Sequence, residues 1–274
     1  MELNGGRSES YGKITVIGTG PGDTEHLSKK ALESVKASET VIGYSSYLRQ
    51  IGDILSEKQE KLPFSMKDEI KRCEAAVKKS LEGKSVALVS GGDAGIYGMS
   101  GLLLEIIDKE SLTGKIPVEI IPGIPAFCAV SAAVGAPITN DFCVVSLSNL
   151  LTPWKDIEKR VRAAAAGDFV IIIYNPKSMK RKEELAIAKN ILLENIEKDR
   201  PAVIAKAATR PDEEIVITTL ENIDKFDIVS MNTTIIIGNG NTYVNDLYMI
   251  TRRGYGNKYD LSKNNIEKNI AEEN

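Results

Sequence analysis

Apolar positions along the first half of the chain follow two periods, and together they predict an α/β domain. Short segments rich in apolar residues, which are typical of buried strands, lie at residues 14–17, 40–42, 85–90 and 118–121. Between Met66 and Leu81, apolar residues instead recur at helical spacing, with lysines and glutamates on the opposite face. One helix is predicted to begin after Ser28, which is a suitable N-cap, and another follows residue 126 and ends at residue 134. Between them, helices are predicted over residues 44–55, 66–81 and 99–107.

The second half has a different pattern. Residues 135–139 have the composition of a hinge, and strands are then predicted over residues 142–147, 169–174, 201–207, 215–220 and 233–237. Helices are predicted over residues 154–166 and, as a charged surface helix, 180–195. Because consecutive strands near the end have no helix between them, the second sheet is expected to be mixed. We therefore expect a loose leader over residues 1–11, α/β domains over 12–136 and 137–254, and a polar tail over 255–274.

Three strands of the first domain run directly into loops rich in glycine and proline. These loops cover residues 18–23, 91–98 and 122–126. In a parallel sheet with right-handed crossovers, the carboxyl ends of the strands share one edge, so the three loops can converge on one ligand. Each loop alone is typical of an ordinary turn, but the three together predict a binding site.

The first loop resembles a dinucleotide fingerprint but departs from it. With Gly18 and Gly20 as the first two glycines, the pattern G-x-G-x-x-G requires a third at position 23, which is Asp23. A carboxylate there repels a pyrophosphate, and Pro21 lacks an N–H that could bind one. The loop is therefore expected to bind a ligand that is not a diphosphate.

Composition excludes several classes of protein. A net charge of −3 gives no reason to expect a nucleic-acid or membrane partner. No apolar run reaches the roughly 20 residues that span a bilayer, and the N-terminus lacks the apolar core of a signal peptide. The three cysteines are scattered, which favours small buried side chains in a reducing cytoplasm. Since His26 is the only histidine, we expect no metal site.

The loop motifs resemble those of a known family. GTGPGD at 18–23, SGGDAGIYG at 90–98, IIPGIPA at 120–126 and GAPIT at 135–139 are similar to the tetrapyrrole methylases. In the second half, SLSNLLTPW at 146–154, YNP at 174–176, AKAATRPDE at 205–213, TTIIIGN at 233–239 and ITRRGY at 250–255 resemble the precorrin-3B C-17 methyltransferases of cobalamin biosynthesis. The resemblance covers residues 12–255.

This resemblance implies an activity and its partners. It implies a homodimer of chains with two α/β domains and S-adenosylmethionine in the cleft between them, with S-adenosylhomocysteine as product. The implied reaction is methylation of C-17 of a cyclic tetrapyrrole rich in carboxylates, coupled to contraction of the macrocycle. The substrate contains cobalt in the anaerobic version of the pathway and is metal-free in the aerobic one.

The resemblance also places the cofactor contacts. They fall on Pro21, Gly91, Gly92, Asp93, Ile96, Pro125, Ala126, Asn175 and Ala208. The family usually has Ser or Thr where this chain has Pro125, so a side-chain hydrogen bond is lost there.

Residue types suggest further roles. Asp93 either faces a positive charge of the cofactor or caps the next helix, and Asp23 is expected to form a turn. His26 is a candidate for moving protons during ring contraction, because the unperturbed pKa of histidine lies near neutrality; the alternative is a surface histidine. Ser146 and Asn149 either bind substrate carboxylates or belong to a polar surface loop.

Three further side chains have two interpretations each. Lys177 and Arg181 either attract the carboxylates of the substrate or are solvated. Tyr97 either stacks on the macrocycle or packs in the core.

Two alternatives remain open at the level of the sequence. The same fold could methylate another tetrapyrrole carbon or ribosomal RNA, although an RNA substrate favours a basic face. A nucleotide-sensing module that binds a ligand without turnover is the alternative outside enzymes.

Overall fold

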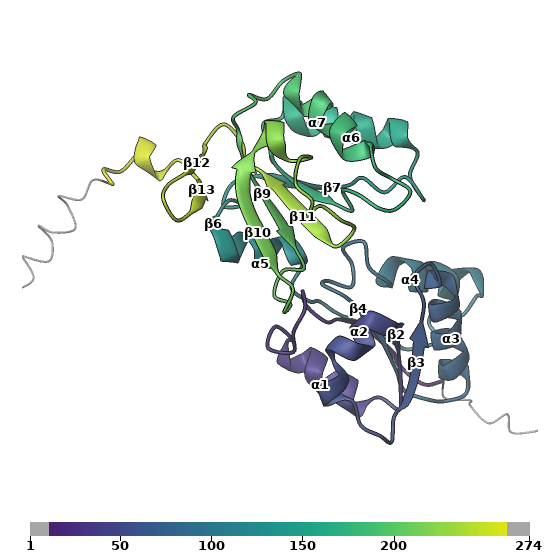
Figure 1. The fold of residues 1–274 in the computed structure, drawn as a ribbon. Coiled ribbons are helices and arrows are strands. Elements are labelled where there is room, and N and C mark those ends of the chain that lie inside the picture. The colour runs from purple at the N-terminus through teal and green to yellow at the C-terminus, as the bar shows by residue number, and fades with distance from the viewer. Residues whose placement is uncertain (1–10, 262–274) are drawn as a thin grey trace, which may run out of the picture. The chain divides into compact units, whose positions relative to one another are not determined.

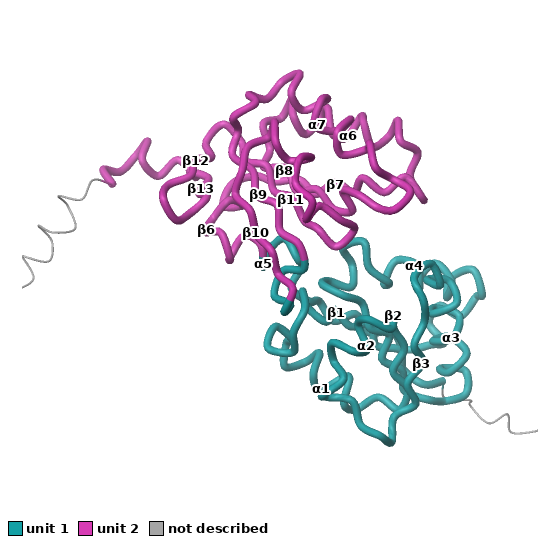
Figure 2. The backbone as a smooth tube through the Cα atoms, in the orientation of Figure 1, with its two compact units in different colours: residues 1–129, 207–211 teal, residues 130–206, 212–274 magenta. Residues whose placement is uncertain are grey.

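The computed structural model describes residues 11–261 (Figure 1). Most of the expected leader and the tail beyond residue 261 lie outside this range. The chain forms two compact units (Figure 2). Unit 1 contains the residues up to Ala129 together with Ala207–Pro211, and unit 2 contains Val130–Lys206 and the residues from Asp212 onward. The division falls inside a helix, α5 (Ala126–Val134), whereas the sequence-based boundary follows that helix.

Unit 1 is built on a five-stranded parallel sheet with the order β3-β2-β4-β1-β5. Its strands are β1 (Ile14–Gly18), β2 (Thr40–Tyr44), β3 (Glu60–Phe64), β4 (Val86–Ser90) and β5 (Val118–Ile121). All residues of β1 and β4 are buried, as expected for central strands that helices cover on both faces. The predicted α/β class and parallel first sheet are confirmed.

Helices pack on both faces of this sheet (Figure 1). On one face, α1 (Lys29–Ala37) and α2 (Ser45–Gln50) contribute Ala31, Val35 and Leu48 to an apolar cluster. On the other, α3 (Glu69–Leu81) and α4 (Ser100–Lys109) contribute Cys73 and Leu103. Ser28 caps α1 as predicted, since its Oγ accepts a hydrogen bond of 3.1 Å from the N–H of Ala31.

In unit 1, one predicted helix is too long and one strand was not predicted. The helix expected over residues 44–55 ends at Gln50, and Gly52–Ile54 forms a short 3₁₀ helix, because glycine weakens a continuing helix. β3 was not predicted at all. It contains Pro63, which a sheet tolerates at an edge strand, where the missing N–H leaves no neighbour unpaired.

Unit 2 has a mixed sheet with the order β10-β9-β11-β8-β7. Its strands are β7 (Phe142–Ser146), β8 (Val170–Tyr174), β9 (Pro201–Lys206), β10 (Glu214–Thr219) and β11 (Thr233–Ile237). Only β7 and β8 pair in parallel; the other pairs are antiparallel, which confirms the predicted mixed sheet. The helices α6 (Trp154–Ala166) and α7 (Glu184–Leu193) pack side by side over the apolar cluster of this sheet (Figure 1).

The hinge expected over residues 135–139 is wrong, because the first of these residues belong to a small third sheet. Gly135 and Ala136 form β6, which pairs in parallel with β13 (Met249–Thr251), and β13 pairs with β12 (Thr242–Val244). The Oγ1 of Thr251 also donates to the carbonyl of Pro137. Residues 135–137 are therefore fixed by pairing within unit 2. A 3₁₀ helix, η2 (Leu220–Asn222), follows β10, and another, η3 (Tyr255–Asn257), follows β13.

Candidate functional site

The three glycine-rich loops of unit 1 meet at one edge of the sheet. They follow β4, β1 and β5, which are adjacent and parallel, so their carboxyl ends lie together. Gly20 and Gly92 join the first two loops by reciprocal backbone hydrogen bonds of 3.1 and 2.7 Å. The predicted convergence of the loops is confirmed.

Close backbone contact explains why glycines stand at this junction. A Cβ on Gly123 would lie 2.2 Å from the carbonyl oxygen of Gly92, and a Cβ on Gly18 would lie 2.5 Å from the nitrogen of Gly123. Any side chain at either position would push backbone against backbone. The loops can approach one another this closely only because these residues have no Cβ.

Asp93 connects the second loop to the third. Its Oδ1 accepts hydrogen bonds from the N–H groups of Gly95 (2.7 Å) and Ile96 (3.1 Å), and its Oδ2 accepts one of 3.0 Å from Gly123. The expected cap of the next helix is wrong, because α4 begins after Met99 with no side-chain cap. Asp93 instead forms a turn within the second loop and a bond across to the third, and its contact with the cofactor stays a prediction. The carboxylate thereby orders both loops through charge-assisted hydrogen bonds.

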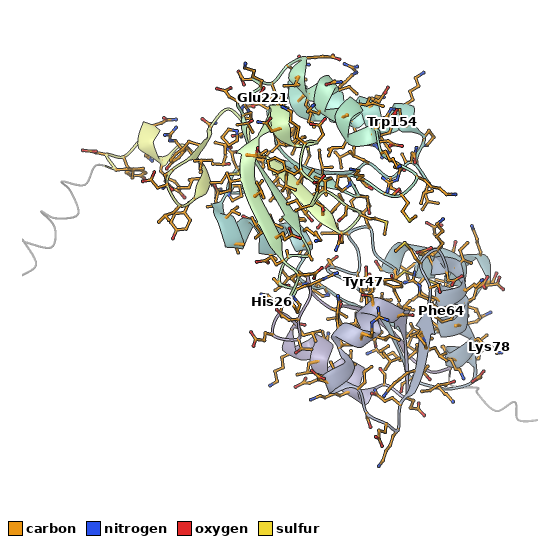
Figure 3. All side chains as sticks on the ribbon, viewed as in Figure 1. His26, Tyr47, Phe64, Lys78, Trp154 and Glu221 are labelled. Carbon is orange, nitrogen blue, oxygen red and sulfur yellow. The ribbon has the colours of Figure 1, made fainter. Side chains whose placement is uncertain are left out.

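Asp23 and His26 form a pair beside the first loop. The Oδ1 of Asp23 accepts a 3.0 Å hydrogen bond from the backbone N–H of His26 and lies 2.5 Å from its Nδ1. Burial alone raises the pKa of the Asp23 carboxyl, but the hydrogen bonds and charge of His26 outweigh it and leave that pKa below its ordinary value. The expected turn at Asp23 is confirmed. Its carboxylate also orients the His26 ring, which is partly exposed (Figure 3).

A segment from the second half of the chain completes this edge. Ala207–Pro211, between β9 and β10, belongs to unit 1. The Nε of Arg210 donates a 3.2 Å hydrogen bond to the carbonyl of Pro21, and a Cβ on Gly22 would lie 2.6 Å from the Cγ of Arg210. Ala207 and Thr209 both have positive φ, which marks a tight bend. The sequence did not predict these contacts, although the motif at 205–213 was a signal for them.

The expected cofactor contacts fall almost entirely in unit 1. This unit holds Pro21, Gly91, Gly92, Asp93, Ile96, Pro125, Ala126 and Ala208, whereas Asn175 lies in unit 2. Two loop side chains are unusually exposed for apolar residues, Ile96 at 37% and Ile124 at 39%. Tyr97, at 60% exposure, does not pack in the core. The assignment of these residues to a cofactor stays a prediction, but unit 1 collects them at one sheet edge.

Unit 2 has its own polar edge, at the carboxyl ends of β7 and β8. The Nδ2 of Asn175 donates a 3.0 Å hydrogen bond to the Oγ of Ser146, which also accepts one of 3.2 Å from the N–H of Ser148. Asn175 has a φ of 51°, which an asparagine tolerates better than most residues. Two residues that the sequence singled out for different roles thus contact each other.

Arg181 is buried, so the interpretation of this residue as a solvated charge is wrong. It is 6% exposed, and its Nη1 donates to the carbonyls of Leu147 (3.0 Å) and Asn175 (2.8 Å). Burial lowers the pKa of its guanidinium, opposed by the charge of Glu184. This anchor holds residues 177–183 as a loop, so α7 begins at Glu184 and not near residue 180.

Asn149 faces a hollow on the surface of unit 2. The hollow has a volume of about 450 Å³, and Asn149 lines it together with Trp154, Met179, Lys180, Lys182, Glu183, Glu184 and Ile187.

The cysteines show no reactive environment. Burial raises the pKa of Cys73 to about 12 and that of Cys143 to about 11, and it also raises the pKa of Cys128. Within residues 11–261, no three His, Cys, Asp or Glu side chains are grouped to hold a metal ion. In the same range, no helix has the length and apolar character needed to cross a bilayer.

Comparison with known proteins assigns the family. The sequence model of the Tetrapyrrole (Corrin/Porphyrin) Methylases matches residues 13–224. The chain belongs to this family. Membership confirms the predicted methyltransferase class and, with it, the methyl donor S-adenosylmethionine.

Individual relatives cover nearly the whole chain. A probable cobalt-factor III C(17)-methyltransferase of Salmonella typhimurium is 44% identical over 242 residues, which are 88% of this chain and 99% of that protein. The cobalt-factor III methyltransferase of Priestia megaterium is 42% identical over 92% of this chain. The chain spans only about half of that longer protein, 47% of its length.

Solved structures agree on the fold. The crystal structure of the methyltransferase CobJ superposes with a TM-score of 0.83 at 32% identity, over 88% of this chain and 100% of that one. A uroporphyrin-III C-methyltransferase of Thermus thermophilus, complexed with S-adenosylhomocysteine, gives a TM-score of 0.66 at 21% identity over 83% of this chain and 97% of that one.

Proposed function

We propose that this protein transfers a methyl group from S-adenosylmethionine to C-17 of a precorrin-3B or cobalt-factor III type tetrapyrrole, with contraction of the macrocycle, in cobalamin biosynthesis. The proposed cofactor is supported by one observation: three loops and Ala207–Pro211 meet at one edge of the sheet of unit 1. The proposed substrate is supported by a relative named for C-17 methylation that aligns over 99% of its length.

The relatives favour a substrate that contains cobalt. Those named for cobalt-factor III include the proteins at 44% and 42% identity, whereas a precorrin-3B C(17)-methyltransferase of Sinorhizobium is 36% identical. We therefore propose the cobalt-containing tetrapyrrole as the substrate of this chain.

The residues at the loop edge fit an adenosyl cofactor. Residues 18–23 contain no lysine or arginine for a diphosphate, and Pro21 has no N–H to offer one. The exposed Ile96 and Ile124 offer apolar surface for an adenine ring, while the glycines allow the backbone to contact ribose and adenine closely. The cofactor supplies an electrophilic methyl group on its sulfonium sulfur.

The chain's own contribution is mainly to position the reactants. Asp93 keeps the second and third loops in register, so the cofactor site is ordered before the substrate binds. A fixed near-attack geometry can lower the barrier by several kcal/mol without a strong acid or base. In the proposed mechanism, His26 exchanges protons through Nε2, because Asp23 already engages Nδ1. Ser146 and Asn149 are proposed to donate hydrogen bonds to carboxylates of the substrate.

We also propose that the protein is a cytoplasmic homodimer that binds neither nucleic acid nor membranes. Light scattering on the purified protein measures its mass directly. A mass of twice 29.8 kDa is expected, and a monomer at micromolar concentration would contradict the proposal.

Calorimetric titration tests the proposed cofactor. S-adenosylhomocysteine is expected to bind near micromolar, which corresponds to about −8 kcal/mol, and NAD is expected not to bind. Binding of NAD would contradict the interpretation of residues 18–23.

Transfer of a labelled methyl group tests the substrate. The cobalt-containing and metal-free tetrapyrroles are compared at equal concentration, and the cobalt-containing one is expected to react faster. Labelling at a carbon other than C-17 would retain the fold and the cofactor but overturn the proposed position.

A further inference from the structure

Tyr47 occupies a position next to the second loop that no role assigned so far explains. It lies in the first turn of α2, directly after β2, and so at the same sheet edge as the three loops (Figure 3). Its ring packs against Gly91, where a Cβ would lie 2.6 Å from Cε1 and Cζ and 3.0 Å from the hydroxyl oxygen. Tyr47 is half-buried, and its hydroxyl has no hydrogen-bond partner among residues 11–261.

Two arginines place positive charge around this hydroxyl. Arg210 uses Nε to reach the carbonyl of Pro21 but forms no ion pair with any carboxylate in the described part of the chain. Arg72, on α3, is 4% exposed and pairs with Glu69 through Nη2, while its Nε is buried and has no partner among the described residues. Burial raises the pKa of Tyr47, and the charges of Arg210 and Arg72 oppose that rise. Tyr47 therefore remains protonated at neutral pH and can donate a hydrogen bond.

An arginine without a counter-ion and a tyrosine hydroxyl without a partner, both at this sheet edge, fit a carboxylate. The terminal nitrogens of an arginine can bind both oxygens of a carboxylate in one plane, and such charge-assisted pairs are stronger than neutral hydrogen bonds. Arg210 contacts the first loop and Tyr47 contacts the second, so an anion between them would lie at the edge of the proposed cofactor site.

We propose that Arg210 and Tyr47 form a carboxylate subsite of unit 1 that binds one acidic side chain of the tetrapyrrole substrate. Arg72 strengthens the subsite with positive charge from the interior. This inference rests on the proposed function. The amino-acid end of the cofactor also carries a carboxylate, so the test must separate the two sources.

The experiment compares four variants with the unaltered protein, the fourth being the conservative Arg210→Lys. Arg210→Gln and Tyr47→Phe remove the two proposed donors, and Arg49→Gln removes an exposed arginine from the same helix as Tyr47. Steady-state methyl transfer to cobalt-factor III gives KM and kcat, and calorimetry gives the affinity for S-adenosylhomocysteine. Thermal unfolding identifies any variant that is not folded.

The expected result is a selective loss of substrate binding. Arg210→Gln raises KM at least about tenfold, as the loss of a charged hydrogen bond predicts, with kcat and S-adenosylhomocysteine affinity within about threefold. Tyr47→Phe raises KM by about three- to tenfold, and Arg49→Gln leaves KM unchanged. Arg210→Lys, which keeps the charge without the planar fork, restores part of the loss.

Two results would overturn the inference. An unchanged KM in both Arg210→Gln and Tyr47→Phe would show that no carboxylate binds there. Weaker binding of S-adenosylhomocysteine by Arg210→Gln, with undiminished binding of 5′-methylthioadenosine, would assign the subsite to the carboxylate of the cofactor. If Arg210→Gln does not fold, the KM of Tyr47→Phe alone tests the inference. Absence of any tetrapyrrole binding or methyl transfer by the unaltered protein, with S-adenosylhomocysteine still bound, would instead show that the proposed function fails.

Discussion

Both units carry an edge where neighbouring parallel strands end, and the two edges are ordered by different means. In unit 1, loops after β1, β4 and β5 meet through glycine backbones, with Asp93 accepting three backbone hydrogen bonds. In unit 2, the ends of β7 and β8 are held by side chains, namely the Ser146–Asn175 hydrogen bond and the buried Arg181.

The difference shows how the same sheet position can serve different contacts. In unit 1, an edge built from backbone brings peptide groups close to a ligand and forms a site of defined shape with little charge. In unit 2, an edge built from side chains presents hydroxyl and amide groups. Substitutions should therefore act differently on the two edges: added volume disrupts the first, and lost hydrogen bonds disrupt the second.

The largest effect is expected from Gly123→Ala. Its Cβ would lie 2.2 Å from the carbonyl oxygen of Gly92, and backbone cannot move aside as a flexible side chain can. The free energy of unfolding should fall by about 3 kcal/mol, and S-adenosylhomocysteine binding should be lost. Gly101→Ala is the control, since no atom lies within 4 Å of its Cβ, and on helix α4 it should stabilise by about 0.5–1 kcal/mol. Urea unfolding measures the free energy of unfolding of both variants. Equal changes in Gly123→Ala and Gly101→Ala would contradict the role of close packing at Gly123.

Arg181→Met tests the side-chain edge. The carbonyls of Leu147 and Asn175 would lose a shared donor, so the free energy of unfolding should fall by about 2–3 kcal/mol. Lys180→Met, at the exposed neighbouring position, should change it by less than about 0.5 kcal/mol. If both variants unfold at the same urea concentration, the anchor role of Arg181 is wrong.

Asp93→Asn removes charge from the backbone-built edge without adding volume. An amide offers one acceptor oxygen in place of two, so at least one hydrogen bond to Gly95, Ile96 or Gly123 is lost. We expect about 2 kcal/mol less stability and at least about tenfold weaker S-adenosylhomocysteine binding. Asp53→Asn, exposed in the 3₁₀ helix after α2, serves as the control. Unchanged affinity in Asp93→Asn would show that the carboxylate does not order the site.

The smallest effect is expected from pH acting on Asp23. Its pKa is lowered on folding, so its ionised form contributes stability above the unfolded value of 3.8, and this contribution is lost as the pH falls through the folded pKa. Because both partners are more than one-third exposed, the contribution is below about 1 kcal/mol. The difference in unfolding free energy between the unaltered protein and Asp23→Asn should thus shrink between pH 7 and pH 3. A difference that grows on acidification would reverse the assigned direction.

Several elements followed from local pattern alone. The predicted bounds of 118–121, 154–166 and 233–237 match β5, α6 and β11, because each is either a short segment rich in apolar and β-branched residues or a regular helical period. The convergence of the loops also followed, since a parallel sheet fixes which strand ends share an edge.

What the sequence did not predict depends on residues far apart in the chain. β6 pairs with β13 across more than a hundred residues, and two-residue strands leave no period to detect. Arg181 looked like one charge in a basic run, because only the folded unit supplies the two carbonyls that bury it. For the same reason, the contact between Arg210 and Pro21 was not predicted, although the motif that contains Arg210 was noticed.

The membership of Ala207–Pro211 in unit 1 has a consequence for synthesis on the ribosome. Pro21 and Arg210 are 189 positions apart, so the first unit cannot make this contact until the chain has grown past residue 210. At roughly 5–20 residues per second, the interval after residue 129 lasts on the order of 4–16 s. During that time all five strands of the first sheet have been synthesised, but Ala207–Pro211, which contacts the first loop at Pro21, has not. Chaperones that bind incomplete domains would meet this chain in that interval.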